Sequence, residues 1–452
     1  MQESLSSDKI ELFETMEMKK AVVKLALPTV VGCLVMVFYN LADTYFVGLI
    51  NDPIETTAVT LVAPVILLFN AVNNLFGVGT ASLMSRALGS RDYETVKKTS
   101  AFGFYAALGS GLIFSLLALI FHTPLLGILG SQASDHDATY AYMTWTVFFG
   151  AAPAILNVVM ANMVRAEGSA MHATLGTVSG CILNIILDPF FILPWGLNMK
   201  AAGAGLATFI ANCVACMYYL VYMRLKKNTT FVTISPKYLK PDMKVVKEVC
   251  SVGVPAAIQN ILNVTGMTIL NNLCSKYGAE AVSAVGIAHK LALIPMYFSM
   301  GIGQGIMPLI GYNYAADNKK RIRQALKTTI SISAVIILVL LLVFLLNPEA
   351  IMRSFMENEL VVEYGAAFLK GMIMATPFFA LDFLAVGVFQ ACGLGKYAFY
   401  FAIARKVVLE IPAMLILDHI FPMYGLAYAQ LCAEIVLGCI AVLLIKKIVS
   451  DK

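Results

Sequence analysis

Long uninterrupted apolar segments recur along the whole sequence, and they limit the possible fold more than any other feature. A helix needs about 20 apolar residues to cross the hydrocarbon core of a bilayer. Only helices and closed barrels satisfy every backbone hydrogen-bonding group in that environment. The segments are continuously apolar and do not show the alternating ten-residue pattern of barrel strands. The chain is therefore predicted to be an all-α integral membrane protein.

Twelve such segments follow one another, and each is predicted to form one transmembrane helix. Their approximate ranges are 22–50, 57–85, 99–121, 138–164, 170–193, 201–224, 250–274, 280–312, 327–347, 360–391, 397–421 and 424–446. The residues before the first segment are acidic, and no small-residue cleavage site follows it. Because a secretory signal has the opposite features, the first segment is interpreted as a membrane helix.

Composition supports a lipid-embedded chain. Of the 452 residues, 59% are hydrophobic and only 13% are charged, whereas soluble domains carry roughly 25% charged residues. The net charge of +5 comes from cations clustered between the apolar segments, which argues against a nucleic-acid partner. Nearly all nine cysteines lie inside apolar segments, so we expect packing residues and no structural metal site.

Basic residues are concentrated at alternate ends of the predicted helices. Lys and Arg accumulate in cytoplasmic loops, so both termini and the long middle connection are expected in the cytoplasm. An even number of crossings agrees with this. The predicted divisions are an N-terminal cytoplasmic segment (1–21), a first lobe (22–224), a cytoplasmic linker (225–249), a second lobe (250–447) and a cytoplasmic tail (448–452).

The two halves repeat the same short motifs in the same order. Leu27-Pro28 recurs as Val254-Pro255, and Gly77-Val78-Gly79 recurs as Gly301-Ile302-Gly303. The other matches are Arg165-Ala166-Glu167-Gly168 with Gln390-Ala391-Cys392-Gly393, Pro189 with Pro412, and Gly205-Leu206-Ala207 with Gly425-Leu426-Ala427. Such a repeat predicts two pseudo-symmetric six-helix lobes with a cavity between them.

Two carboxylates lie inside predicted helices of the first half. A charge at the bilayer centre costs about 2.5 to 3.5 kcal/mol on insertion scales, so the presence of each carboxylate there needs an explanation. Asp43 lies near the outer end of the first helix, and Asp188 lies one turn after Asn184 and directly before Pro189. Both are expected in the outer half of the membrane. A structural role in capping or bracing kinked helices is the alternative to a functional one.

Facing one interior, these two acids are candidate proton carriers, because burial and like-charge repulsion both disfavour two negative charges. Oxygen ligands nearby would also suit a sodium ion. The candidate ion-coupling residues are Asp43, Asp188, Asn184, Thr208, Tyr39 and Asn40. The sequence does not choose between proton and sodium.

The second half carries other intramembrane charges. Arg405 and Lys406 lie close to Glu410 along one helix, so intrahelical ion pairs are expected. Lys290 and Asp382 have no partner nearby in sequence, which leaves open a cross-helix pair or a cavity-lining role. Methionine and aromatic faces suit a pocket for organic cations. The candidate cavity residues are Met36, Gln259, Asn263, Lys290, Tyr297, Asp382 and Glu410.

Motifs of energy-coupled pumps and hydrolases are absent from the sequence. It has no Gly-x-x-x-x-Gly-Lys-Ser/Thr loop, His-Glu-x-x-His motif, Gly-x-Ser-x-Gly motif or dinucleotide fingerprint. An ATP-driven pump and a membrane enzyme are both disfavoured. A secondary transporter without a cofactor remains.

Several of these motifs together resemble the MATE family of multidrug and toxic-compound exporters. They are Leu27-Pro28, the run from Tyr39 to Gly48, Gly77-Val78-Gly79 with Arg86-Ala87-Leu88-Gly89, Arg165-Ala166-Glu167-Gly168, and the run from Asn184 to Pro189. The similarity covers about residues 20–447 and is closest to the MepA-like bacterial branch. It implies a V-shaped pair of six-helix lobes that exports cationic compounds in exchange for protons or sodium.

The resemblance also implies a site in the first lobe. In relatives, an Asp of helix 1, an Asn/Asp pair of helix 5 and a Thr of helix 6 bind the ion. The matching positions here are Asp43, Asn184, Asp188 and Thr208. The chain departs from some MepA-like relatives at Gln304, where they carry an acid, and not every such relative keeps an acid at the position of Asp43.

The expected function is an antiporter, coupled to protons or sodium, that exports amphipathic organic cations by alternating access. It is expected to work as a monomer in the inner membrane of a bacterium. The alternative is a flippase of a lipid-linked oligosaccharide or other lipid. Lys290 and Arg405 favour that alternative, because a pyrophosphate group needs cations in the cavity.

Overall fold

The computed structural model describes residues 7–239, 242–355 and 358–450, which form helices and connecting turns without a strand. The first half contains α2 (Ser7–Glu14), α3 (Met18–Gly48), α4 (Pro53–Gly89), α5 (Tyr93–Ile120), α6 (His122–Leu129), α7 (His136–Met143), α8 (Ala151–Ala166), α9 (Ala170–Ile192) and α10 (Lys200–Leu225). The second half contains α11 (Met243–Cys274), α12 (Ala279–Ala315), α13 (Lys319–Leu346), α14 (Pro348–Arg353), α15 (Glu359–Ala391), α16 (Gly395–Ile403), α17 (Ile411–Ile420) and α18 (Tyr424–Ser450).

The all-α membrane architecture is confirmed. Within the described ranges, eleven helical stretches are long and apolar enough to cross a membrane, with α7 and α8 joined into one of them. The remaining predicted helix, 397–421, is present as α16, a π-helical turn over Ala404–Glu410, and α17. The turn, which contains Arg405, Lys406 and Glu410, divides this segment into two α-helices that are each too short to cross a membrane alone.

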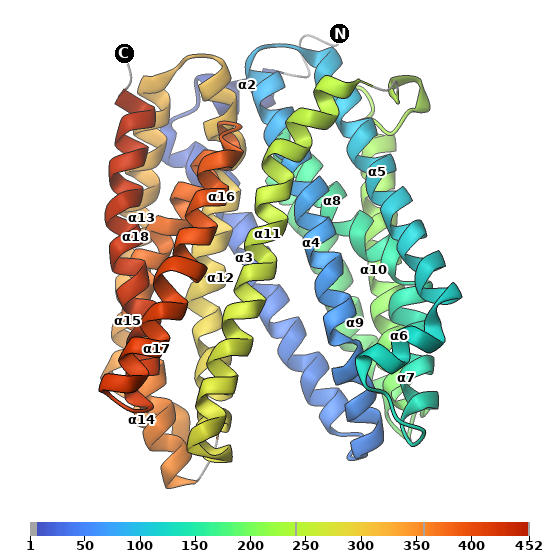
Figure 1. The fold of residues 1–452 in the computed structure, drawn as a ribbon. Coiled ribbons are helices and arrows are strands. Elements are labelled where there is room, and N and C mark those ends of the chain that lie inside the picture. The colour runs from blue at the N-terminus through green and yellow to red at the C-terminus, as the bar shows by residue number, and fades with distance from the viewer. Residues whose placement is uncertain (1–6, 240–241, 356–357, 451–452) are drawn as a thin grey trace.

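The helices form two groups that meet at one end of the molecule and separate toward the other (Figure 1). Both termini lie at the end where the groups meet, as an even number of crossings requires. The first helix of each half packs against the opposite half: α3 contacts α12 as well as α9, and α11 contacts α4. The predicted end segments and linker include residues 1–6, 240–241 and 451–452, which lie outside the described residues.

Glycines allow this crossed packing. A Cβ atom on Gly301 would lie 2.8 Å from Val30 Cα in α3, and one on Gly305 would lie 2.7 Å from Ala26 Cα. In the matching motif of the first half, Gly79 lies against the backbone carbonyl of Val249 in α11. The repeated motif therefore serves the same purpose in both halves, because it lets the second helix of one half approach the first helix of the other.

The short helix α2 bridges the halves at the end where they meet. Its backbone carbonyls at Leu12 and Phe13, and that of Met16 just after the helix, accept hydrogen bonds from the Arg321 guanidinium of α13. The Phe13 ring also stacks on Tyr312 of α12, with the ring centroids 4.8 Å apart.

Two ion pairs hold α2 to the first half. Lys9 Nζ lies 2.7 Å from Glu167 Oε1, and Glu14 Oε1 lies 3.3 Å from Arg91 Nη2. The same Glu14 oxygen accepts a hydrogen bond of 2.7 Å from the Tyr312 hydroxyl, so this carboxylate contacts both halves. The sequence predicted a cytoplasmic segment here and no helix.

Two alanine substitutions in α12 should change stability in opposite directions. Alanine is favoured over glycine inside helices by roughly 0.5 to 1 kcal/mol, and Gly286 has no heavy atom within 4 Å of an added Cβ. Gly286→Ala should therefore raise the melting temperature of the purified protein. Gly305→Ala should lower it, because the new methyl group collides with Ala26. A higher melting temperature in both variants would contradict the tight α3–α12 contact.

Candidate functional site

A hydrogen-bonded group of three predicted residues lies inside the first half, between α9 and α10. Asp188 and Asn184 are buried. With the Asn184 amide oriented so that both its ends are satisfied, its Nδ2 donates to Asp188 Oδ2 at 2.9 Å. Its Oδ1 accepts from the backbone nitrogen and the hydroxyl of Thr208 at 3.1 and 3.2 Å. The amide therefore connects the carboxylate of α9 to α10.

Helix α3 brings Asp43 and Tyr39 to this group. Tyr39 is within hydrogen-bonding reach of Thr208, and Asp43 lies close enough to interact electrostatically with both Tyr39 and Asp188. Tyr142 of α7 interacts with the same two carboxylates and was not predicted. A lone tyrosine in an apolar segment carries no signal that would have distinguished it from a packing residue.

The Asn40 side chain is bonded to its own helix instead of to this group. It is exposed, and its side-chain nitrogen donates to the Met36 carbonyl one turn back at 2.8 Å. The predicted set is therefore brought together except at this position. A short amide side chain in a helix readily bonds its own backbone, which accounts for the difference.

The group leaves one acidic oxygen unsatisfied. Asp188 Oδ1 is buried and has no hydrogen-bond partner. A buried carboxylate oxygen is costly unless it receives a proton, a cation or a donor. Among the described residues no group of three or more His, Cys, Asp and Glu side chains is arranged to hold a metal ion. Two carboxylates with amide and hydroxyl oxygens offer a setting for a proton or a small monovalent cation.

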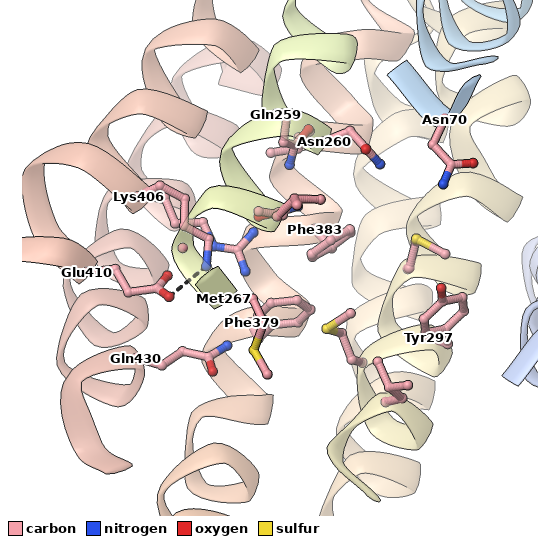
Figure 2. Close-up of a pocket in the computed structure, with 18 of the residues that line it drawn as sticks. Asn70, Gln259, Asn260, Met267, Tyr297, Phe379, Phe383, Lys406, Glu410 and Gln430 are labelled. Atoms are coloured by element: carbon pink, nitrogen blue, oxygen red, sulfur yellow. Dashed lines mark hydrogen bonds and ion pairs between the residues drawn. The ribbon is translucent and has the colours of Figure 1, made fainter. Parts of the chain in front are cut away.

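A cavity of about 560 Å³ lies between α4 of the first half and the helices of the second half. Its size falls within the range of drug-binding pockets. Its wall is rich in neutral carboxamides, namely Asn70, Asn74, Gln259, Asn260, Asn263, Asn271, Gln304, Gln390 and Gln430. Six methionines and three aromatic rings also line it: Met267, Met296, Met300, Met307, Met372, Met414, Tyr297, Phe379 and Phe383. Figure 2 shows a part of this wall.

Four of the seven predicted cavity residues line this wall: Gln259, Asn263, Tyr297 and Glu410. Asp382 is buried and paired with Arg405, which does reach the wall. Lys290 is exposed and Met36 is half-buried, and the structure places neither of them on the wall.

Buried charges lie at the π-helical end of the cavity. Arg405 is 3% exposed, and its guanidinium lies 3.1 Å from Asp382 Oδ2 of α15 and 2.8 Å from Glu434 Oε1 of α18. It also lies 4.4 Å from the ring centroid of Phe379. The distances define ion pairs, although the carboxylate oxygens of Asp382 and Glu434 accept no hydrogen bond of good geometry.

The two intrahelical pairs expected from sequence have different outcomes. Lys406 Nζ lies 2.6 Å from Glu410 Oε1, so that pair is confirmed. Arg405 instead pairs across helices, because two carboxylates from α15 and α18 are available to its planar guanidinium. Glu434 lies in α18, on a part of the chain whose proximity to Arg405 only the fold reveals.

Comparison with known proteins places the chain among membrane exporters. The family model MatE matches residues 28–190 and 255–416, one copy in each half. The chain is 32% identical over 443 residues to the multidrug export protein MepA of Staphylococcus aureus (strain MRSA252), covering 98% of this chain and 96% of that protein. It is 31% identical over 442 residues to the MepA protein of Staphylococcus haemolyticus (strain JCSC1435), with the same coverage.

Solved structures share the fold. One described as the outward-facing conformation of a multidrug resistance MATE family transporter has a TM-score of 0.91 at 24% identity, covering 98% of both chains. Another, a transporter of the MOP superfamily from Pyrococcus furiosus Vc1 (DSM3638), has a TM-score of 0.90 at 24% identity and the same coverage. The V-shaped arrangement of two lobes is therefore shared.

Arg405→Met should strongly destabilise the protein. The substitution leaves Asp382 and Glu434 buried without their counter-ion, which typically costs about 3 to 5 kcal/mol. The triple variant Asp382→Asn, Arg405→Met, Glu434→Gln should recover most of the lost stability, since no unpaired charge remains. Melting curves of the purified proteins test this. An equally unstable triple variant would show that the packing of these side chains matters more than their charges.

Proposed function

The chain belongs to the MATE family, and we propose that it exchanges organic cations for protons or sodium ions. As a member of this family it is a multidrug efflux transporter of the bacterial plasma membrane and not an enzyme. The observation that carries ion coupling is the group around Asp188. It holds two carboxylates on different helices, one of them with an unpartnered buried oxygen. Binding of a proton or a sodium ion there would remove an uncompensated negative charge from the lobe.

Helix α3 is the element through which ion binding would reach the cavity. It carries Asp43 and Tyr39 and packs against α9 on one side and α12 on the other. Its Pro28 carbonyl accepts a hydrogen bond of 2.8 Å from Thr174 of α9, which fixes the helix near its proline. Since α12 lines the cavity and touches α3 through Gly301 and Gly305, a shift of α3 would move the cavity wall.

In alternating access the two ends of the cavity open one after the other, so the end where the halves meet must also open. We propose that this end faces the cytoplasm, as the basic residues predict, and that α2 must detach from one lobe during the cycle. Its contacts to Glu167 and Arg91 on one lobe and to Arg321 and Tyr312 on the other connect the two halves. One chain supplies both walls of the cavity, which supports function as a monomer.

The lipid flippase is the weaker alternative. Its substrate would need cations in the wall that are available to a pyrophosphate group. Arg405 and Lys406 reach the wall, but each is already paired with a buried carboxylate. Amides, methionines and aromatic rings instead suit amphipathic compounds with an apolar body.

Asp43→Asn and Asp188→Asn should each abolish ion-driven export. Both substitutions keep the shape of the side chain and remove the ionisable group. Ethidium extrusion from cells should fall to the level of cells without the gene, and purified protein in liposomes should no longer respond to a proton or sodium gradient. Normal extrusion by Asp43→Asn would exclude Asp43 from coupling.

Asp52→Asn is the matched control for these two variants. Asp52 caps α4 outside the membrane-spanning helices, and hydrogen bonds from Lys200 and from the Ile54 backbone hold the pKa of its carboxyl below the usual range. The carboxylate therefore stays ionised through the physiological range and is no candidate for proton exchange. Its loss should leave extrusion and its pH dependence unchanged.

Arg321→Ala should favour opening of the end where the termini lie. It removes the donor that holds two carbonyls of α2 and the Met16 carbonyl just after it. Spin labels on the exposed turn residues Ser90 and Ala316, on a cysteine-free background, would report the separation of the two halves there. The variant should show a larger population at long distance than the control Lys320→Ala at the exposed neighbouring position. Identical distance distributions would contradict the proposed role of α2.

A further inference from the structure

Arg405 and Lys406 are neighbours in sequence but differ in how firmly they are held. Arg405 is fixed by two carboxylates and by the face of Phe379. Lys406 has one ion-pair partner, Glu410, at the end of a flexible side chain. Its stem and ammonium lie 3.1 Å from where a Cβ of Gly266 in α11 would be, so they rest on that glycine. Lys406 is therefore the cation at this end that a ligand can displace.

Glu410 offers a ligand an acceptor. Its side chain is 4% exposed and lines the cavity, and Lys406 occupies only its Oε1 atom. The Oε2 atom is buried without a hydrogen-bond partner. Figure 2 shows Glu410 on the same side of the cavity as Lys406 and Gln430, with Met267 and Phe379 beside them. An ammonium group at this position would meet a carboxylate and apolar surfaces together.

The charges at this end do not balance. Three carboxylates, those of Asp382, Glu410 and Glu434, face two cations, Arg405 and Lys406. Counted as side chains in their usual ionised forms, these five have a formal net charge of −1 in an interior where an unpaired charge is costly. One additional positive charge brings this group to neutrality, whereas two would exceed it.

We infer that Glu410 binds the cationic group of the exported compound and that Lys406 is an internal counter-ion which this group displaces. The inference rests on the proposed function and deepens it. It defines the preferred substrate as a monovalent cation, an ammonium or amidinium attached to an apolar, often aromatic body. Such a compound would pair with Glu410 while its body contacts the methionines and rings of the wall.

The pair is tested by measuring ethidium binding to purified protein by fluorescence anisotropy. Glu410→Gln should weaken binding about tenfold or more, since it removes a charge-assisted contact. Lys406→Gln should tighten binding about tenfold, because the carboxylate no longer has an internal competitor. It should also raise the affinity for the divalent cation propidium by a larger factor, since the group then has a net charge of −2.

Opposite effects of the two variants separate recognition from a structural role. A purely structural ion pair predicts weaker binding in both single variants and recovery in the double variant Lys406→Gln, Glu410→Gln. Lys290→Gln is the matched control, because it removes one positive charge at an exposed position that is not on the wall. It should leave both affinities unchanged.

Melting curves show whether each variant folds. If Lys406→Gln does not fold, Lys406→Arg replaces it: an arginine can hold Glu410 by two bonds and should weaken ethidium binding. Equal or tighter binding by Lys406→Arg would overturn the inference, as would weaker binding by Lys406→Gln. If the unmodified protein binds neither dye, the proposed function fails. If it binds ethidium and the Lys406 variants do not follow the expected signs, only this inference fails.

Discussion

The cost of an unpaired charge inside a lipid-embedded protein organises both halves of this molecule. In the second half, five buried charged groups approach neutrality by pairing across α15, the π-helical turn Ala404–Glu410 and α18. In the first half, Asp188 is supported by Asn184 and keeps one oxygen without a partner. The arrangement in the second half is largely self-neutralised. On the proposed assignment, the one in the first half is neutralised by an ion from outside the protein.

Crossed helix packing allows these two regions to influence one another. The α3–α12 contact depends on Gly301 and Gly305, where the helices approach too closely for any side chain. Closely packed helices move together, because interiors at crystal-like density resist local deformation. α3 is therefore well placed to connect the acidic group of the first half with a cavity lined mainly by the second half.

Local patterns predicted most of the helices and the Asn184–Asp188 pair, since apolar length and helical spacing depend on nearby residues. The resemblance to the MATE family placed Thr208, on another helix, beside that pair. The sequence did not predict α2, whose Phe13 carbonyl and Glu14 carboxylate are held by Arg321 and Tyr312, about 300 positions further along the chain. Nor did it predict the partners of Arg405 or the carboxamides of the cavity other than Gln259 and Asn263. Those features depend on which faces of distant helices meet, and no single helix contains that information.

The separation of the acidic group from the cavity has a consequence for how exchange would work. An exporter whose ion and substrate share one carboxylate couples them by direct competition. Here Asp188 lies between α9 and α10, whereas Glu410 lines the cavity from the π-helical turn. On the proposed assignment, the ion and the drug bind at different sites. They compete because each favours a different conformation of the whole protein. Coupling then depends on how strongly each ligand favours one arrangement of α3 and α12, and the glycine contacts between these helices become as important as the carboxylates.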